Sequence, residues 1–204
     1  MGEDLSAQDL LAAYGIEPEE ETADEYRGVM VLAEGAGGAI SEPSLGALGA
    51  AREVADALGA RLEALLPGGG DDEAAALIRH GADVVLLSDA QSEYDPDQWS
   101  GALTAVIQSR KPEVVILAAS DVARDIGPRV AQRLHTGLIA GAQEVRPEAD
   151  ERLLVGIVPL YGGRLLGEFA CPDKRPQMIC LAEGAGRIPS ADASRQGEIE
   201  RLAT

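Results

Sequence analysis

The sequence predicts an α/β fold built on an open, mostly parallel sheet, and the stretch 113–140 shows this most clearly. The run 114–119 is wholly apolar, which is typical of a strand buried on both faces of a parallel sheet. A polar loop and an amphipathic helix follow it, and the apolar run 138–140 then begins another strand. Short apolar runs and helical segments alternate in the same way through most of the chain. Such alternation favours a parallel sheet whose helices connect successive strands.

The leader 1–27 is acidic and contains one short predicted helix. Ser6 can cap this helix, which carries Leu10 and Leu11, and Gly15 can end it. One interpretation is a docking peptide that lays its apolar side chains on a partner. The other is a leader that frays or packs on its own domain, and we favour it because an exposed helix this short is marginal alone.

The first predicted strand covers 28–33, and the Gly-rich loop 34–40 follows it. The backbone N–H groups of a loop between a strand and a helix can bind phosphate. Here Glu34 and Glu42 flank the loop and no Lys or Arg lies nearby, which favours a plain turn over a phosphate site. A helix over 41–58 comes next, with a serine and a proline at its start.

The second strand is predicted over 61–66, and Asp71 or Asp72 can cap the helix after it. His80 ends this helix, and we prefer an interaction with the helix dipole to a catalytic role for it. The third strand covers 84–87. The helix predicted over 95–107 has a buried face formed by Trp99, Leu103 and Val106.

The central unit has a polar loop over 120–127 between its strand and its helix. Pro128 stands where the first turn of a helix tolerates proline, because its missing N–H would have no partner there. Gly137 ends this helix before the fifth strand, 138–140. In open sheets of this kind, ligands and partners usually meet the loops at the carboxyl ends of the strands.

The later part of the chain departs from the alternation of strands and helices. Strands over 153–159 and 165–170 are predicted to pair antiparallel, because the turn 161–163 between them contains Gly-Gly. The last predicted strand is 177–182. A polar tail, 184–204, ends the chain, and a short helix is expected from its glycine at position 197 to the leucine at position 202.

The composition restricts the kinds of partner and site. The formal net charge is −18, which disfavours nucleic acid or an anionic membrane as a partner. No apolar run approaches the ~20 residues of a membrane span, and no secretory signal opens the chain, so we expect a cytoplasmic protein. Cys171 and Cys180 form no Cys-x-x-Cys motif, and we interpret them as small buried apolar residues.

No catalytic constellation stands out in the sequence. The carboxylates are spread along predicted helix faces and loops, which is typical of a solvated charged surface. No cluster of histidine, cysteine and carboxylate has the spacing of a zinc site. We therefore expect neither enzyme activity nor a metal site.

Several motifs occur in a characteristic order. The stretch 119–140 contains Arg-Asp-Ile-Gly-Pro-Arg, then Gln-Arg-Leu and Thr-Gly-Leu. The first strand closes with a glutamate at 31–34, and the turn at 159–163 reads Pro-Leu-Tyr-Gly-Gly. Together these resemble the amino-terminal domain of electron-transfer flavoprotein alpha subunits, and the resemblance covers roughly residues 28–183. Two positions depart from the family pattern: Gly141 replaces an acidic residue, and an arginine follows the turn where the family has asparagine.

The resemblance implies a Rossmann-like three-layer sandwich of the adenine-nucleotide-hydrolase type. The strand order would be 3-2-1-4-5, with the hairpin and the last strand extending the sheet. The order reverses between strands 1 and 4, so the segments 34–42 and 119–127 would flank a crevice there. The candidate residues for a nucleotide in this crevice are Glu34, Gly35, Gly37, Gly38, Ser120 and Arg124.

The resemblance also implies a role. In that family, the alpha amino-terminal domain is a scaffold against a beta subunit that holds AMP or a second flavin, while FAD lies mainly in the alpha carboxyl-terminal domain. This chain stops where that FAD domain would begin, so we expect no cofactor on this chain alone, and FAD and AMP in the partner or the complete complex. We therefore expect a scaffold that pairs with a beta-type subunit in electron transfer from a flavin dehydrogenase.

The alternative is a stand-alone module that binds AMP or ATP directly in the crevice. If the chain is instead a scaffold, its partner surface should lie where the family match is densest, because the family places those regions near the junction with the other subunit and the flavin domain. The candidates are Arg124, Asp125, Pro128, Arg129, Tyr161, Gly162, Gly163 and Arg164.

Overall fold

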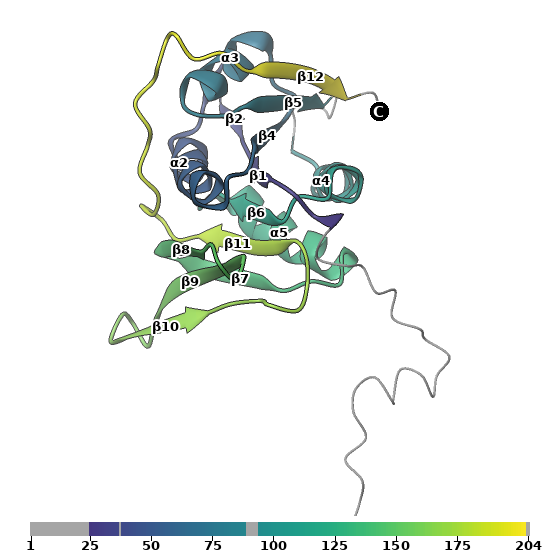
Figure 1. Cartoon of the computed structure of the whole chain (residues 1–204). Coiled ribbons are helices and arrows are strands. Elements are labelled where there is room, and N and C mark those ends of the chain that lie inside the picture. The colour runs from purple at the N-terminus through teal and green to yellow at the C-terminus, as the bar shows by residue number, and fades with distance from the viewer. Residues whose placement is uncertain (1–24, 37, 89–93, 203–204) are drawn as a thin grey trace, which may run out of the picture.

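The computed structural model describes residues 25–36, 38–88 and 94–202, and Figure 1 shows helices on both faces of a central sheet. The strands of this sheet are β1 (Val29–Leu32), β4 (Leu62–Pro67), β5 (Val84–Ser88), β6 (Val114–Leu117), β7 (Leu138–Ala142), β11 (Gln177–Leu181) and β12 (Glu198–Leu202). They pair in parallel in the order β12-β5-β4-β1-β6-β11-β7. The predicted class, a three-layer α/β sandwich, is confirmed.

The helices divide between the two faces of the sheet. They are α2 (Glu42–Leu58) and α3 (Asp71–Arg79) on one face, and α4 (Pro96–Arg110) and α5 (Asp121–Arg133) on the other. Successive residues of a strand point to opposite faces, so Val31 of β1 belongs to the same core cluster as Leu48 of α2, whereas Met30 belongs to the cluster of Leu103 of α4. All four side chains are buried. Burying an apolar side chain of this size stabilises a fold by about 1.5–3 kcal/mol.

The helix starts follow their capping residues. Ser41 accepts a hydrogen bond from the N–H of Ser44 at the start of α2, and Asp95 accepts two from the first turn of α4. The helix starts predicted at these positions are confirmed. The expected cap of α3 by Asp71 or Asp72 is wrong, because Gly70 is the N-cap residue. The Gly70 N–H donates to the Glu73 carboxylate at 3.0 Å, so an acidic side chain of the first turn still caps the start of this helix.

The start of α5 differs from the prediction. The segment 120–127 was expected to be a loop, but the helix begins at Asp121, and Pro128 lies inside it. An internal proline costs a helix roughly 3 kcal/mol. Two features offset that cost: Ile126 is fully buried, and Gly127 lies so close to the sheet that an added Cβ would be 2.8 Å from Leu117. Tertiary packing here overrides the local preference of proline.

The sheet order confirms part of the expected topology and corrects the rest. The expected order of the first four strands matches β5-β4-β1-β6. The fifth strand, β7, does not follow β6, because β11 lies between them. The strands β8 (Glu144–Glu148), β9 (Leu153–Leu160) and β10 (Leu165–Phe169) form a separate antiparallel sheet rather than an extension. The hairpin of β9 and β10 is confirmed, and Gly156 lets β9 approach the main sheet, since a Cβ there would be 2.9 Å from Ile139.

The tail also differs from the prediction. Residues 198–202 form the edge strand β12 beside β5, not a helix. Salt bridges hold this strand: Glu198 pairs with Arg61 at 3.1 Å, and Glu200 pairs with Arg110. Local sequence could not reveal this strand, because its hydrogen-bonding partner β5 lies far away along the chain.

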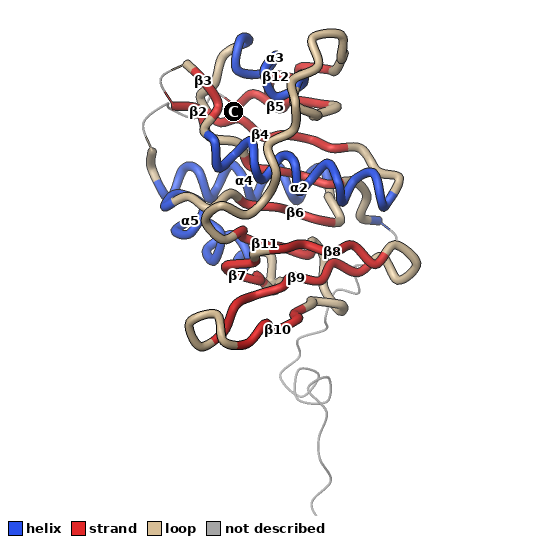
Figure 2. Tube along the Cα trace, turned by 90° about the vertical axis from the view of Figure 1, so that its left-hand side faces the viewer, coloured by secondary structure: helices blue, strands red, loops and turns tan. Residues whose placement is uncertain are grey.

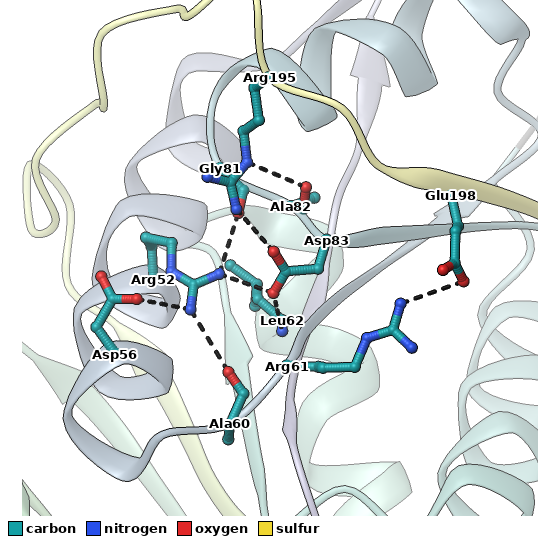
Figure 3. A network of polar contacts seen from close by, with 10 residues as sticks. All are labelled: Arg52, Asp56, Ala60, Arg61, Leu62, Gly81, Ala82, Asp83, Arg195 and Glu198. Carbon is teal, nitrogen blue, oxygen red and sulfur yellow. Dashed lines mark hydrogen bonds and ion pairs between the residues drawn. The ribbon is translucent and has the colours of Figure 1, made fainter.

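A network around Asp83 fixes the segment that leads to β12, as Figure 3 shows. The carboxylate of Asp83 accepts from Arg52 at 2.9 Å, from Arg195 at 2.7 Å and from the Leu62 N–H at 2.8 Å. These donors hold the pKa of Asp83 below its usual value, although burial opposes the shift. His80 contributes from α3 through a 2.7 Å hydrogen bond between its Nδ1 and the Pro189 carbonyl, which gives this histidine a structural role.

Candidate functional site at the carboxyl edge of the sheet

The candidate site lies where the strand order reverses, at the carboxyl ends of β1 and β6. The loop after β1 contains a small hairpin of β2 (Gly35–Ala36) and β3 (Ala39–Ile40). The loop after β6 leads into the first turn of α5. Figure 2 shows β2, β3, α5 and the turn between β9 and β10 on the same side of the molecule. The residues that flank the crevice and those of the turn 161–163 therefore lie on the same side of the fold.

Glu34 and Ser120 meet at this edge. The Ser120 hydroxyl donates to Glu34 Oε1 at 2.5 Å, and the same hydroxyl oxygen accepts from the Ala123 N–H as the N-cap of α5. On the other side, the Glu34 N–H donates to Ser44 of α2 at 2.9 Å. These bonds fix the Glu34 carboxyl group beside the amino end of α5.

The position of Glu34 decides which ligands the crevice can accept. Burial raises the pKa of its carboxyl group, and the negative charge of Asp121 raises it further, while the hydrogen bond from Ser120 lowers it. In related folds, the amino end of a helix at this position is where a phosphate binds. Here an acidic side chain of the protein itself stands at that helix end.

A further acidic group lies against the Gly-rich loop. The Glu73 carboxylate of α3 lies against Gly35, where an added Cβ would be 2.5 Å from its Oε1. Gly38 has a left-handed backbone with φ of 86° and is open to solvent, while Gly37 lies outside the described residues. Within the described part of this loop, no cationic side chain forms a hydrogen bond or an ion pair, whereas the Glu73 carboxylate lies against Gly35.

The predicted cations of α5 are engaged with carboxylates. Arg124 pairs with Asp121 at 3.2 Å, one turn away. Arg129 pairs with Asp125 at 3.1 Å and reaches Asp97 of α4 at 3.4 Å. Both arginine side chains remain about half exposed, so they are accessible to a partner.

Tyr94 joins this group, although no motif in the sequence predicted its contact there. Its hydroxyl donates to Asp125 Oδ2 at 2.7 Å, and its ring packs edge-on against Trp99 with ring centres 5.6 Å apart. Burial and the hydrogen bond to Asp125 raise the pKa of Tyr94 to about 12. In return, the bond from Tyr94 and that from Arg129 hold the pKa of Asp125 below its usual value.

The second predicted group forms the tip of the β9–β10 hairpin. Tyr161, Gly162 and Gly163 all have positive φ angles, of 51°, 68° and 82°. A left-handed backbone is uncommon for a tyrosine, and this side chain is 79% exposed. The turn therefore presents an aromatic ring to solvent, with Arg164 exposed beside it.

The two cysteines lie outside any redox arrangement. Burial raises the pKa of both thiols, so little thiolate forms at neutral pH. The Cys180 thiol lies under the candidate edge and donates to the Ala118 carbonyl at 3.4 Å. Both cysteines are free thiols.

A cavity of about 680 Å³ lies at the opposite, amino edge of the sheet. Of the arginines that line it, three are paired with carboxylates: Arg61 with Glu198, Arg110 with Glu63 and Glu200, and Arg152 with Glu113. None of the predicted site residues lines this cavity, and we place the candidate site at the carboxyl edge on the basis of its chemistry.

Two further findings concern metal binding and membrane spans. Within residues 25–36, 38–88 and 94–202, no three histidine, cysteine or acidic side chains gather in a way that could hold a metal ion. None of the helices in those ranges is both long enough and apolar enough to cross a membrane.

Comparison with known proteins gives consistent matches. A model of the electron transfer flavoprotein domain matches residues 29–204. Protein FixB of Clostridium saccharobutylicum is 39% identical over 172 residues, which cover 83% of this chain and 52% of that protein. The electron transfer flavoprotein subunit alpha of Clostridium acetobutylicum is 35% identical over 184 residues, 88% of this chain and 55% of that protein.

A third relative is a subunit of an enzyme. The subunit LctC of the lactate dehydrogenase (NAD(+),ferredoxin) of Acetobacterium woodii is 29% identical over 182 residues, 87% of this chain and 43% of that protein. The chain spans about half the length of the curated relatives it matches.

Proposed function

Because the chain belongs to the electron transfer flavoprotein family, we propose that it is an alpha-type subunit, or the amino-terminal part of one, that serves as a scaffold in electron transfer. It pairs with a beta-type subunit and supports the flavin-carrying parts of the complex. The observation that carries this proposal is the Glu34 carboxyl group at the amino end of α5, the kind of helix end at which related folds bind phosphate.

The residues at this edge do not fit a flavin or an adenine nucleotide. FAD and AMP carry phosphate groups, which bind where backbone N–H groups and cations converge. At this edge, Glu34 and Asp121 stand at the helix end, and Glu73 lies against the loop. Arg124 is the nearest predicted cation, and it is paired with Asp121. We therefore assign FAD and AMP to the partner or to the complete complex.

The same argument weighs against a stand-alone module for AMP or ATP. Such a module would bring the phosphates of its ligand within reach of the Glu34 carboxyl group in a partly buried position. Ionised groups of like sign repel strongly at short range when water is excluded. Nothing in the described loop compensates for that repulsion.

The chain's own contribution is a rigid, charged surface. The strands β1 and β6 are wholly buried, so the loops that follow them start from fixed positions. Helix α5 then presents Arg124, Asp125, Pro128 and Arg129, and the hairpin presents the turn 161–163 on the same side. Partner recognition here depends on charge placement and on the exposed tyrosine, while flavin chemistry belongs to the cofactor of the complex.

The electron donor is proposed to be a flavin dehydrogenase. One relative is a subunit of a lactate dehydrogenase that uses NAD(+) and ferredoxin, and others are electron transfer flavoprotein alpha subunits. These names support a place beside a dehydrogenase without specifying its substrate.

Co-purification tests the proposal. The chain is expressed with an affinity tag together with the beta-type subunit encoded in the same genome, and the eluted complex is analysed for a second chain and for flavin. We expect both chains to elute together in equal amounts. A wild-type chain that never retains the beta-type subunit would overturn the scaffold function.

A further inference from the structure

Strand β10 leaves one edge of the small antiparallel sheet open. It pairs with β9 on one side only, and within the described chain no strand covers its other side. Leu165 and Leu166 are 58% and 63% exposed, and Phe169 is 43% exposed. An exposed apolar edge strand is a template for pairing with another strand, and proteins usually protect such an edge with charges, proline or a bulge. On β10 itself, one charged residue stands among these apolar side chains.

The backbone groups that face the open edge can be identified. Glu168 lies opposite Ile157 in the β9–β10 ladder, and the Ile157 carbonyl accepts from the Gln143 N–H, on the far side of β9. The pair of Ile157 and Glu168 is therefore a non-hydrogen-bonded pair, because each residue of a strand directs its N–H and C=O to the same side. It follows that Glu168 and, two positions earlier, Leu166 direct these groups to the open edge.

The residues of β10 whose backbone groups face the open edge, together with Arg164 just before the strand, complement a second copy of themselves. If two copies of β10 pair antiparallel about a two-fold axis at Leu166, this leucine meets its own copy, and Arg164 meets Glu168 of the second copy. Opposite charges directly across two strands stabilise the pair, as do apolar contacts. On the other face, Leu165 would lie across from Gly167, where the ring of Phe169 fills the space of a side chain, so that leucine and this ring would make an apolar contact. A register centred on Gly167 would instead place Leu166 against Glu168.

We propose that β10 pairs with β10 of a second copy of this chain, so that the two small sheets become one continuous sheet across a two-fold axis. Dimers with a two-fold axis are the commonest soluble oligomers. The overall charge of −18 opposes it, but at physiological ionic strength interactions beyond about 8 Å are largely screened. The Arg164–Glu168 contacts act at shorter range, so the dimer should be stronger at physiological than at low salt.

This inference goes beyond the proposed function. It concerns the chain alone, and its failure would leave pairing with a beta-type subunit unaffected. The open edge lies next to the turn 161–163, so a beta-type subunit that covers this turn would compete with the second copy. Self-association should therefore be measured without a partner.

Sedimentation of the 204-residue chain and its charge-reversal variants tests the register. Wild type should be dimeric at about 100 μM, well above a micromolar dissociation constant. Arg164→Glu and Glu168→Arg should each be monomeric, because each places like charges opposite one another in the dimer. An equimolar mixture of the two variants should dimerise again, since every facing pair then has opposite charges. Arg187→Glu, which makes the same change of charge as Arg164→Glu away from the strand, should remain dimeric.

Each outcome bears on the inference. A wild type that stays monomeric at this concentration overturns it, and so do single variants that dimerise as wild type does or a mixture that stays monomeric. Glu168→Arg also removes an exposed ion pair with Arg146, which contributes little to stability. Melting temperatures within a few degrees of wild type would show that both variants are folded.

Discussion

The hydroxyl of Tyr94 donates a 2.7 Å hydrogen bond to Asp125, although 31 positions separate the two residues. Tyr94 stands just before α4 and Asp125 lies on α5, so this bond links the two helices that cover one face of the sheet. Asp125 also accepts from Arg129 at 3.1 Å. The tyrosine therefore helps to hold the arginine in position on the candidate partner surface.

Replacing Tyr94 should change how Asp125 titrates. In Tyr94→Phe, the carboxylate loses the hydrogen bond that contributes most to its lowered pKa, so that pKa should rise toward its usual range. A lowered carboxyl pKa contributes stability that is present above the usual pKa and is lost as pH falls through the folded-state pKa. The variant should therefore lose less stability than wild type on acidification. Carboxyl-detected NMR titration measures the shift, and an unchanged Asp125 pKa would contradict the prediction.

The contribution of Glu34 to stability should depend on pH in the opposite direction. Its pKa is raised, mainly by burial, so the folded state binds the proton more tightly than the unfolded chain does. The free energy of unfolding then decreases as pH rises from the unfolded pKa through the folded one. In Glu34→Gln this contribution disappears, so the variant should gain stability relative to wild type as pH rises from acidic to neutral. Urea denaturation across that range measures the difference, and a difference that does not depend on pH would exclude a raised pKa.

The arginines of α5 should matter for binding and little for folding. Arg124→Ala and Arg129→Ala should each keep the melting temperature within a few degrees, because exposed ion pairs contribute roughly 0–1 kcal/mol. Each should weaken binding of the beta-type subunit at least tenfold, or about 1.4 kcal/mol. Arg61→Ala is the matched control, since Arg61 is exposed and paired but lies away from this edge. If both α5 variants bind as well as Arg61→Ala does, this surface is not the interface.

The purified chain should be colourless and should not respond to adenine nucleotides. The Glu34 carboxyl group stands where the phosphate would bind, so AMP, ATP and FAD should each leave the melting temperature unchanged. A ligand that binds the folded state tightly would raise it in a concentration-dependent way. A shift that saturates in the micromolar range, or a stoichiometric flavin absorption band, would favour the nucleotide-binding alternative.

Gly186 should be far less tolerant of substitution than Gly184. Both have positive φ, so alanine at either position should cost about 1–2 kcal/mol from backbone strain alone. At Gly184, the added Cβ would meet nothing within 4 Å, whereas at Gly186 it would be 2.3 Å from the Gly46 carbonyl oxygen of α2. Gly186→Ala should therefore lower the free energy of unfolding well beyond Gly184→Ala. Equal losses in chemical denaturation would show that this close approach does not constrain the tail.

The accuracy of the sequence predictions followed the range of the interactions involved. Apolar runs identified the buried strands, and capping residues identified the starts of α2 and α4, because those signals are local. The start of α5 was wrong because packing of Ile126 and Gly127 against the sheet outweighs the local effect of Pro128. The insertion of β11 and the strand β12 depend on pairing between distant segments, which no local pattern encodes.

In the candidate site, too, local contacts were easier to predict than contacts between distant segments. Asp125 and Arg129 are four positions apart, a spacing that makes them neighbours once the helix starts at Asp121, but Asp125 was predicted to lie in a loop. The contact of Ser120 with Glu34 could have been predicted, because both residues were expected beside the crevice where the strand order reverses. Tyr94 and Glu73 were missed, since their contacts at this edge arise only when α3 and α4 are placed against their neighbours.

The edge strand β12 has a consequence for the order of events during synthesis. Its partner β5 consists entirely of buried residues, and it leaves the ribosome roughly 100 residues before residues 198–202 do. At about 5–20 residues per second, one edge of this apolar strand stays uncovered for on the order of 10 s. Growing chains on neighbouring ribosomes could pair along it in that interval, because an open apolar edge invites strand addition. The need for chaperones during translation should therefore be greatest just before the last strand emerges.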